Sequence, residues 1–227
     1  MSYFSRITLD ASDYHANRMM RTISENSYRE HQALWKLFPN SPDANRDFIY
    51  RVEQRDLRRV YYMVSQREPA HEQSWMVESK PYKPSISKGQ MLAFSLRINP
   101  VVTRKDESGR HQRHDVVMDA KQQSGYQKLP TDERPPMSKL IQEAGAKWLR
   151  DRCEKHGFTF SDDSITIESY DQHQSYKQGN RRPIRYSTMD MAGVLRVEDV
   201  ECFYEVLKNG IGPAKAFGCG LMLVRRI

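Results

Sequence analysis

Hydrophobic and polar residues show two kinds of pattern along the first half of this chain, one typical of helices and one typical of strands. Apolar residues at helical spacing, among them Leu34 and Trp35, predict a helix over 24–37, and Pro39 follows where that helix must end. The preceding stretch, 10–23, is polar and predicts no element. Alternating or short apolar runs predict strands at 3–9, 47–54, 59–66, 75–80 and 91–98.

The second half begins with weak periodicity and continues with clear elements. Residues 101–136 are rich in charge, glycine and proline, which predicts a linker or a long functional loop. Apolar residues on one face, such as Leu140 and Trp148, predict a helix over 137–155. The remaining predictions are strands at 164–170, 189–197 and 221–224, a hairpin-like basic excursion at 174–187, and a helix at 198–208.

The order of these elements predicts an α+β fold with two similar halves. Each half has the order of the split β-α-β, or ferredoxin-like, unit. Such a unit has an open antiparallel sheet face, which RRM domains use to bind RNA. We therefore predict two tandem ferredoxin-like (RRM-like) domains at 1–100 and 137–227, joined by 101–136.

Composition excludes several classes of protein. With 227 residues, 38% of them hydrophobic, the chain is long enough for one large domain or two small ones. Its cysteines, Cys153, Cys202 and Cys219, form no CxxC pair, which favours a reduced cytoplasmic protein without a zinc site. No apolar run reaches the roughly 18 residues of a membrane span, and the N-terminus lacks the apolar core of a signal peptide.

Positive charge gathers in two segments. The net charge of +7 suggests a polyanionic partner such as nucleic acid. Segment 174–187 carries cations without an acid, whereas 104–114 also holds two acids. Solvated surface loops have the same composition, so this alternative stays open. The predicted RNA-contacting cations are Lys177, Arg181, Arg182 and Arg185 in the first segment and Arg104, Lys105, Arg110 and Arg113 in the second.

A glycine-rich loop near the C-terminus separates a predicted helix from a predicted strand. Glycine lets backbone N–H groups approach a ligand, and successive N–H groups form an anion-binding concavity. Lys215 adds a positive charge at the centre of the loop. The loop therefore suits phosphate contact, although a tight turn with positive φ requires the same residue type. Its glycines are Gly210, Gly212, Gly218 and Gly220.

Three segments, taken in order, resemble a known family. They are His31–Asn40 (HQALWKLFPN), Phe94–Pro100 (FSLRINP) and Asn209–Leu221 (NGIGPAKAFGCGL). Together they resemble the CasE family, the pre-crRNA endoribonuclease subunits of type I-E CRISPR Cascade complexes, whereas 103–187 matches poorly. The resemblance implies tandem ferredoxin-like domains of the RAMP type. It also implies cleavage of the repeat RNA at the 3′ base of its stem-loop, retention of that hairpin within Cascade, and no metal or other cofactor.

The resemblance also assigns catalytic residues. The family's histidine, which precedes the LW-x-LFPN segment, falls on His31, and its tyrosine one turn earlier falls on Tyr28. Histidine suits proton transfer, and residues three apart share a helix face, so both side chains are able to meet one phosphate. Lys36 and Lys215 are candidate cations beside that phosphate. From the residues alone, a histidine next to Leu34 is also typical of a packed side chain.

Two other function classes fit part of this pattern. A non-catalytic RNA-binding RAMP subunit would have the same folds, but it would not need Tyr28 and His31. A basic ribosomal-type α+β protein would explain the charge, but not the long insertion or the glycine-rich loop. The expected partners are the CRISPR repeat hairpin and other Cascade subunits, with no membrane contact.

Overall fold

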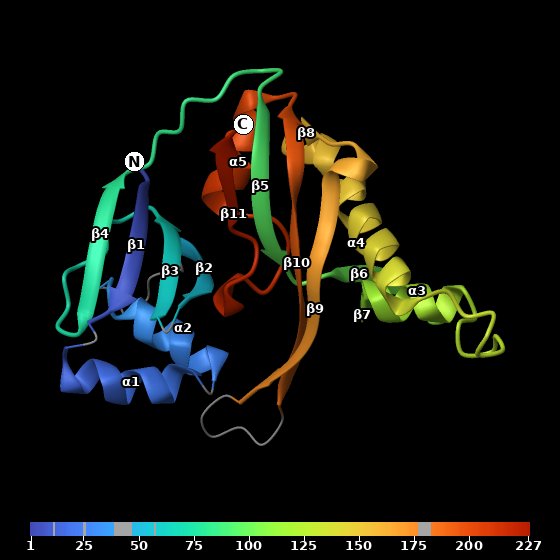
Figure 1. The fold of residues 1–227 in the computed structure, drawn as a ribbon, viewed down its shortest axis with the longest axis horizontal. Helices are drawn as coiled ribbons and strands as arrows, with labels where there is room; N and C mark the ends of the chain where they lie inside the picture. Colours follow the sequence, from blue (N-terminus) through green and yellow to red (C-terminus); the bar gives the residue numbers. More distant parts are fainter. Residues whose placement is uncertain (11, 25, 39–46, 57, 177–182) are drawn as a thin grey trace. The chain divides into compact units, whose positions relative to one another are not determined.

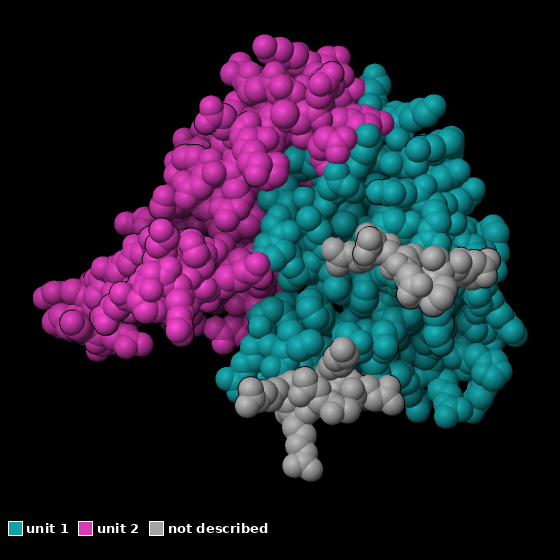
Figure 2. Space-filling view, turned by 180° about the vertical axis from the view of Figure 1, so that it is seen from behind, with its two compact units in different colours: residues 1–85, 173–186, 206–221 teal, residues 86–172, 187–205, 222–227 magenta. Residues whose placement is uncertain are grey.

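The chain forms two compact units, each assembled from segments far apart in the sequence (Figures 1 and 2). Unit 1 comprises 1–85, 173–186 and 206–221. Unit 2 comprises 86–172, 187–205 and 222–227. The computed structural model describes residues 1–10, 12–24, 26–38, 47–56, 58–176 and 183–227.

Unit 1 contains a four-stranded antiparallel sheet in the order β2-β3-β1-β4. The first strand lies inside the sheet, because Ile7 is opposite Tyr61 of β3 on one side and Val77 of β4 on the other. The strands predicted from alternation are confirmed to within two residues at each end. They are β1 (Tyr3–Leu9), β2 (Phe48–Arg55), β3 (Arg58–Ser65) and β4 (Trp75–Pro81).

Two helices, α1 (Tyr14–Ser24) and α2 (Ser27–Trp35), precede β2 and contribute to the core of unit 1. The predicted helix is confirmed as α2, which begins three residues later than expected. The prediction of no element at 10–23 is wrong. Ala16 and Ile23 of α1 are buried in one core with Leu34 of α2, so their helical spacing carried a signal that the polar neighbours obscured.

Unit 2 contains a sheet in the order β11-β5-β10-β8, with β9 also paired to β10. β5 has strict alternation, and its even-numbered residues from Leu92 to Ile98 are buried. The long strands β9 and β10 also contribute their loop-proximal ends to unit 1. The strands are β5 (Met91–Ile98), β8 (Phe158–Thr159), β9 (Ile165–Ser175), β10 (Ile184–Val197) and β11 (Met222–Arg226).

The long helix of unit 2, α4 (Met137–Cys153), packs closely on its sheet. A Cβ at Gly145 would lie 2.6 Å from Met189 Sδ and 2.7 Å from Ile167 Cδ1. The apolar face of α4 also buries Trp148 and Leu149. Glycine therefore sets the spacing between this helix and β9 and β10. A further helix, α5 (Val200–Asn209), begins in the residues of unit 2 and ends in those of unit 1.

Residues 101–136, predicted as a linker or loop, contain regular structure. β6 (Val101–Lys105) and β7 (His111–Asp115) form a separate hairpin, and α3 (Val116–Gln123) follows. The Asp115 carboxylate caps α3 by accepting hydrogen bonds from Val117 N and Met118 N. Short 3₁₀ turns complete the fold at η1 (Glu154–His156), η2 (Asp162–Ser164) and η3 (Lys215–Phe217).

The α+β class with two ferredoxin-like sheets is confirmed. The compact units nevertheless differ from the predicted ranges 1–100 and 137–227. β5 pairs with β10 and β11, which places it in unit 2, and unit 1 draws its last segment from 206–221. Within the described part of the chain, no helix combines the length and apolar character that crossing a membrane requires.

Candidate catalytic site around His31

The start of α2 is fixed by a side-chain cap. Asn26 is extended (φ −152°), and its side-chain oxygen accepts a hydrogen bond of 2.9 Å from Tyr28 N. An asparagine in this position satisfies one of the backbone N–H groups that a helix leaves unpaired at its N-terminus. Tyr28 and His31 then follow at i and i+3, and both are half-buried. The cap therefore fixes where α2 begins, and with it the positions of these two predicted catalytic residues along the helix.

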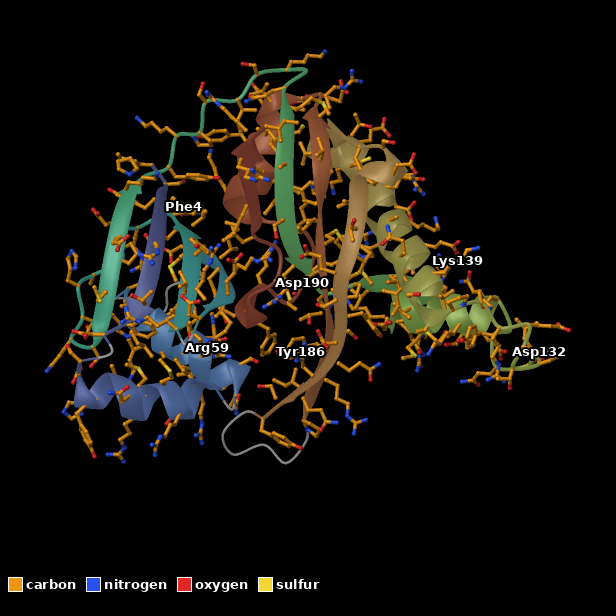
Figure 3. The ribbon with its side chains drawn as sticks, in the orientation of Figure 1. Phe4, Arg59, Asp132, Lys139, Tyr186 and Asp190 are labelled. Atoms are coloured by element: carbon orange, nitrogen blue, oxygen red, sulfur yellow. The ribbon has the colours of Figure 1, made fainter. Side chains whose placement is uncertain are left out.

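A buried carboxylate fastens α2 to the sheet. Glu30 is only 5% exposed, and its Oε1 accepts hydrogen bonds from Arg59 Nη1 at 2.6 Å and from Tyr61 Oη at 3.0 Å. Burial, together with the nearby Glu30 charge, raises the pKa of Tyr61. Figure 3 labels Arg59, whose side chain lies beside α2. Because Glu30 is adjacent to His31, this ion pair limits how far the histidine's backbone can move.

The imidazole of His31 lies among aromatic rings. Its centroid is 5.7 Å from the Trp35 ring, 5.6 Å from Phe48 and 6.3 Å from Tyr50, to which it is nearly parallel at 15°. These contacts hold one face of the imidazole against β2 while the residue stays half-buried. The ring is therefore oriented before any substrate arrives, which general acid–base catalysis requires.

The glycine-rich loop packs against the same part of unit 1. Tyr50 Oη donates a hydrogen bond of 3.0 Å to the carbonyl of Ala216 in η3, and η3 also contacts α2. Burial raises the pKa of Tyr50 well above its ordinary value, so this hydroxyl remains a donor. A Cβ at Gly218 would lie 3.4 Å from the Tyr50 ring. His31 and the predicted phosphate-binding loop therefore both contact Tyr50 of β2.

Backbone conformation explains why this loop is rich in glycine. All four predicted glycines have positive φ, between 70° and 96°. A Cβ at Gly220 would also lie 2.8 Å from the Ile211 carbonyl oxygen. The tight-turn explanation therefore accounts for these residues, and phosphate contact by the same loop stays a prediction. Lys215 is half-buried at the start of η3.

The inner ends of β9 and β10 lie against the start of α2. Tyr186 Oη donates a hydrogen bond of 2.9 Å to Ser27 Oγ, and Ser175 Oγ donates one of 2.7 Å to Asn26 Oδ1. Asn26 Nδ2 in turn donates to the Tyr176 carbonyl at 2.8 Å. The predicted basic hairpin is consequently connected to the helix cap that positions Tyr28. Figure 3 labels Tyr186 at this junction.

An aromatic stack joins that hairpin to the glycine-rich loop. The Tyr186 ring stacks on His173 at 5.0 Å and on Phe217 of η3 at 4.7 Å, with interplanar angles below 25°. Stacked pairs of this kind add stability beyond the area that they bury. Helix α2, the glycine-rich loop and the base of the hairpin therefore form one connected structure within unit 1.

The other predicted RNA-contacting residues are distributed over both units. Lys36 is exposed at the C-cap of α2, and Arg185 is exposed on β10 within unit 1. Lys177, Arg181 and Arg182 lie outside the described residues.

The separate hairpin β6–β7 belongs to unit 2. Arg104 forms a two-point ion pair with Asp119, at 3.0 and 2.6 Å, which raises the pKa of Arg104 and lowers that of Asp119. Lys105 and Arg113 are exposed and share one face of the hairpin, and Arg110 is exposed in its turn. The charge of Arg104 is already compensated, so Lys105, Arg110 and Arg113 are the stronger RNA candidates, and that role stays a prediction.

Sequence reasoning missed several residues that build this site. Asn26 lies inside the helix predicted over 24–37 but caps α2 in the structure, and asparagine is a residue type that signals a helix start. Tyr50, Ser175 and Tyr186 gave no local signal, because each meets α2 or the loop only after the chain has folded. In the described part of the chain, no three His, Cys, Asp or Glu side chains gather in a way that suits a metal ion.

The sequence matches a family model described as CRISPR associated protein over residues 2–226. The chain belongs to this CRISPR-associated family. Its relatives include the CRISPR system Cascade subunit CasE of Escherichia coli K12, with 30% identity over 206 residues, 89% of this chain and 93% of the relative. Another relative is the CRISPR-associated endoribonuclease Cse3 of Thermus thermophilus, with 25% identity over 92% of this chain and 94% of that protein.

Solved structures of the CRISPR-associated family support the fold. A Thermus thermophilus Cse3 structure, bound to an RNA representing a pre-cleavage complex, covers 99% of this chain and 98% of its own. It has a TM-score of 0.70 and 24% sequence identity. Both the sequence match and the structural match thus extend over nearly the whole chain.

Proposed function

We propose that this protein is an endoribonuclease that binds the stem-loop of a CRISPR repeat and cuts the precursor RNA at the 3′ base of the stem. The names of its relatives, a Cascade subunit and an endoribonuclease, support this activity. The observation that carries the proposal is the placement of His31, on one helix face with Tyr28 and beside the glycine-rich loop. Chemistry at a phosphate needs a group that transfers protons and donors that stabilise negative charge. The histidine supplies the first, and the backbone N–H groups of the loop supply the second.

The reaction uses the RNA's own 2′-hydroxyl as the nucleophile. This oxygen attacks the adjacent phosphorus in line, the bond to the 5′-oxygen breaks, and the products carry a 2′,3′-cyclic phosphate and a 5′-hydroxyl. One proton leaves the 2′-hydroxyl and one reaches the 5′-oxygen. His31 transfers one of these protons, and Tyr28 orients the 2′-hydroxyl or shares the transfer. Lys215 and the loop N–H groups stabilise the charge that develops on the phosphorane. None of these steps requires a metal ion.

After cleavage, the protein keeps the hairpin and joins other Cascade subunits. The cations of the basic hairpin and of β6–β7 hold the stem through its phosphates, because the deep, narrow major groove of A-form RNA limits the reading of base edges. We place this activity in the cytoplasm, where the precursor RNA is made.

Cleavage of the host's CRISPR repeat RNA in the presence of EDTA tests this function. We expect the wild-type protein to cut at the 3′ base of the stem and to leave a cyclic phosphate. His31→Ala should retain RNA binding and cut about 10²- to 10⁴-fold more slowly, because a proton-transfer group has been removed. His71→Ala, an exposed histidine in the same unit, is the matched control and should cut at the wild-type rate.

A substrate with a 2′-deoxy nucleotide immediately before the cut completes the design. It lacks the nucleophile, so it should bind normally and stay intact. Equal cutting by wild-type protein and His31→Ala would remove His31 from the mechanism. Cutting of the 2′-deoxy RNA would contradict 2′-hydroxyl attack.

A second candidate is a non-catalytic RNA-binding subunit with the same fold. The aromatic contacts of His31 with Trp35, Phe48 and Tyr50 also suit a structural histidine. Tight binding of the repeat hairpin with no cutting by the wild-type protein would favour this candidate.

A further inference from the structure

The surface formed by α1 and α2 is strongly basic. Four cations lie exposed on it: Arg18 and Arg21 on α1, and Arg29 and Lys36 on α2 and its cap. Among the described residues, no carboxylate forms an ion pair with any of the four. Glu30, the acid of α2, is buried and already paired with Arg59. The described part of this helix pair therefore presents positive charge without a compensating negative charge.

An aromatic ring stands at the far end of this surface. Tyr14, the first residue of α1, is 76% exposed, which is unusual for a large aromatic side chain. Its ring has an edge contact of 5.8 Å with His15. Tyr14, Asn17, Arg18 and Arg21 line an open hollow of about 310 Å³. Tyr14, Arg18 and Arg21 follow at i, i+4 and i+7, so they form one stripe along the helix.

This stripe leads toward the candidate catalytic site. The C-terminal end of α1, where Arg21 lies, is followed after a short connection by the start of α2 with Tyr28. The two helices contact each other and belong to the same unit (Figure 1). The seven residues from Arg21 back to Tyr14 span about 10 Å at 1.5 Å per residue. That length matches about three nucleotides at a stacked spacing of about 3.4 Å.

We propose that the exposed face of α1 binds single-stranded RNA that continues past the cut. Arg21 and Arg18 contact successive phosphates, and the Tyr14 ring stacks on a base. Exposed aromatic rings interleaved with cations are the chemistry that binds single-stranded nucleic acid without reading its sequence. The proposal rests on the proposed function: the stem lies 5′ of the scissile phosphate, so the strand 3′ of that phosphate is the unpaired one.

Binding of two uncleavable RNAs tests this inference. Both carry the 2′-deoxy nucleotide before the cut; one ends just past the scissile phosphate, and the other extends by six further unpaired nucleotides. The wild-type protein should bind the extended RNA about tenfold more tightly. Tyr14→Ala, and separately the double variant Arg18→Ala/Arg21→Ala, should abolish that difference and leave binding of the short RNA unchanged. Tyr14→Phe should retain the difference, because stacking needs the ring and not the hydroxyl.

Salt dependence and a control pair sharpen the test. For the extended RNA, the double arginine variant should lower the slope of log K against log salt by roughly 1.4, since two phosphate contacts on a single strand are lost. Lys80→Ala/Lys83→Ala removes two exposed cations elsewhere in unit 1 and should change neither the slope nor the difference.

The outcomes separate this inference from the proposed function. Failure of the wild-type protein to bind or cut any repeat hairpin would overturn both. Normal cutting with equal affinity for the short and extended RNAs would overturn the α1 site alone. An equal loss of affinity for both RNAs in the variants would place α1 against the stem, which also contradicts a single-strand site.

Discussion

The two sheets have related antiparallel strand orders, yet the helices beside them are built differently. In unit 1, α2 meets the sheet through a buried carboxylate and a half-buried histidine among aromatic rings. In unit 2, α4 meets its sheet through Gly145, Trp148 and Leu149, and its backbone comes close enough to exclude a Cβ. Both helices also bury apolar side chains, and Gln142 of α4 forms hydrogen bonds with the backbone of β9, so the difference between the two helices is the ion pair that joins α2 to its sheet. This ion pair restrains the backbone beside His31, whose ring is oriented by its aromatic neighbours, and such restraint suits the catalytic role proposed for His31.

Replacing Glu30, the buried carboxylate of α2, should lower the stability of the protein more than the other predicted changes. Glu30→Ala leaves Arg59 and Tyr61 without their shared acceptor, and the side chain of Glu30 is only 7% exposed in the ion pair. We expect a loss of about 3 kcal/mol in the free energy of unfolding, measured by denaturant titration with circular dichroism. Glu143→Ala removes an exposed carboxylate from α4, with its partner Lys139 at 4.0 Å, and should cost less than about 0.5 kcal/mol. Similar losses for the two variants would contradict the contrast.

Alkaline pH should destabilise unit 1 through its buried tyrosines. Burial raises the pKa of both Tyr50 and Tyr61 above the ordinary value of 10.0. The unfolded chain releases these protons near pH 10 and the folded chain keeps them, so the contribution of these two tyrosines to stability is constant well below pH 10 and falls above it. Each tyrosine should cost about 0.7 kcal/mol per pH unit at pH 10, and this slope should approach about 1.4 kcal/mol per pH unit at higher pH. Unfolding titrations between pH 8 and 11 measure this slope, and Tyr61→Phe should make it shallower; an unchanged slope would exclude Tyr61 as a source.

A methyl group at Gly145 should have the smallest effect and report on the packing of α4. Gly145→Ala gains about 1 kcal/mol in helix propensity but must displace the ends of the Met189 and Ile167 side chains, at a cost of about 1–3 kcal/mol. We expect a net loss of about 1 kcal/mol in the free energy of unfolding. A variant more stable than wild type would show that the space between α4 and the sheet accommodates a methyl group without strain.

Local patterns predicted the elements better than they predicted the site. β5 was predicted at its observed ends, because a short apolar run that Asn99 and Pro100 close is typical of a buried strand. α1 was missed, although Ala16 and Ile23 recur at helical spacing, because polar residues dominate its exposed face.

The candidate site depends on contacts that no local pattern encodes. The Tyr50 hydroxyl reaches the carbonyl of Ala216, 166 residues later in the chain, and Tyr186 reaches Ser27 across 159 residues. Sequence periodicity reports burial and not the identity of the partner. The family resemblance could therefore name His31 and Tyr28, but not the aromatic and hydrogen-bonded surroundings that orient them.

The interleaved composition of the two units has a consequence for biosynthesis. His31 emerges from the ribosome well before the loop that packs against Tyr50, because that loop belongs to 206–221. Unit 1 is thus complete only after the segment 206–221 has been translated. A prematurely terminated chain would contain His31 and Tyr28 without the loop that completes their surroundings, so this arrangement withholds the assembled site from unfinished chains.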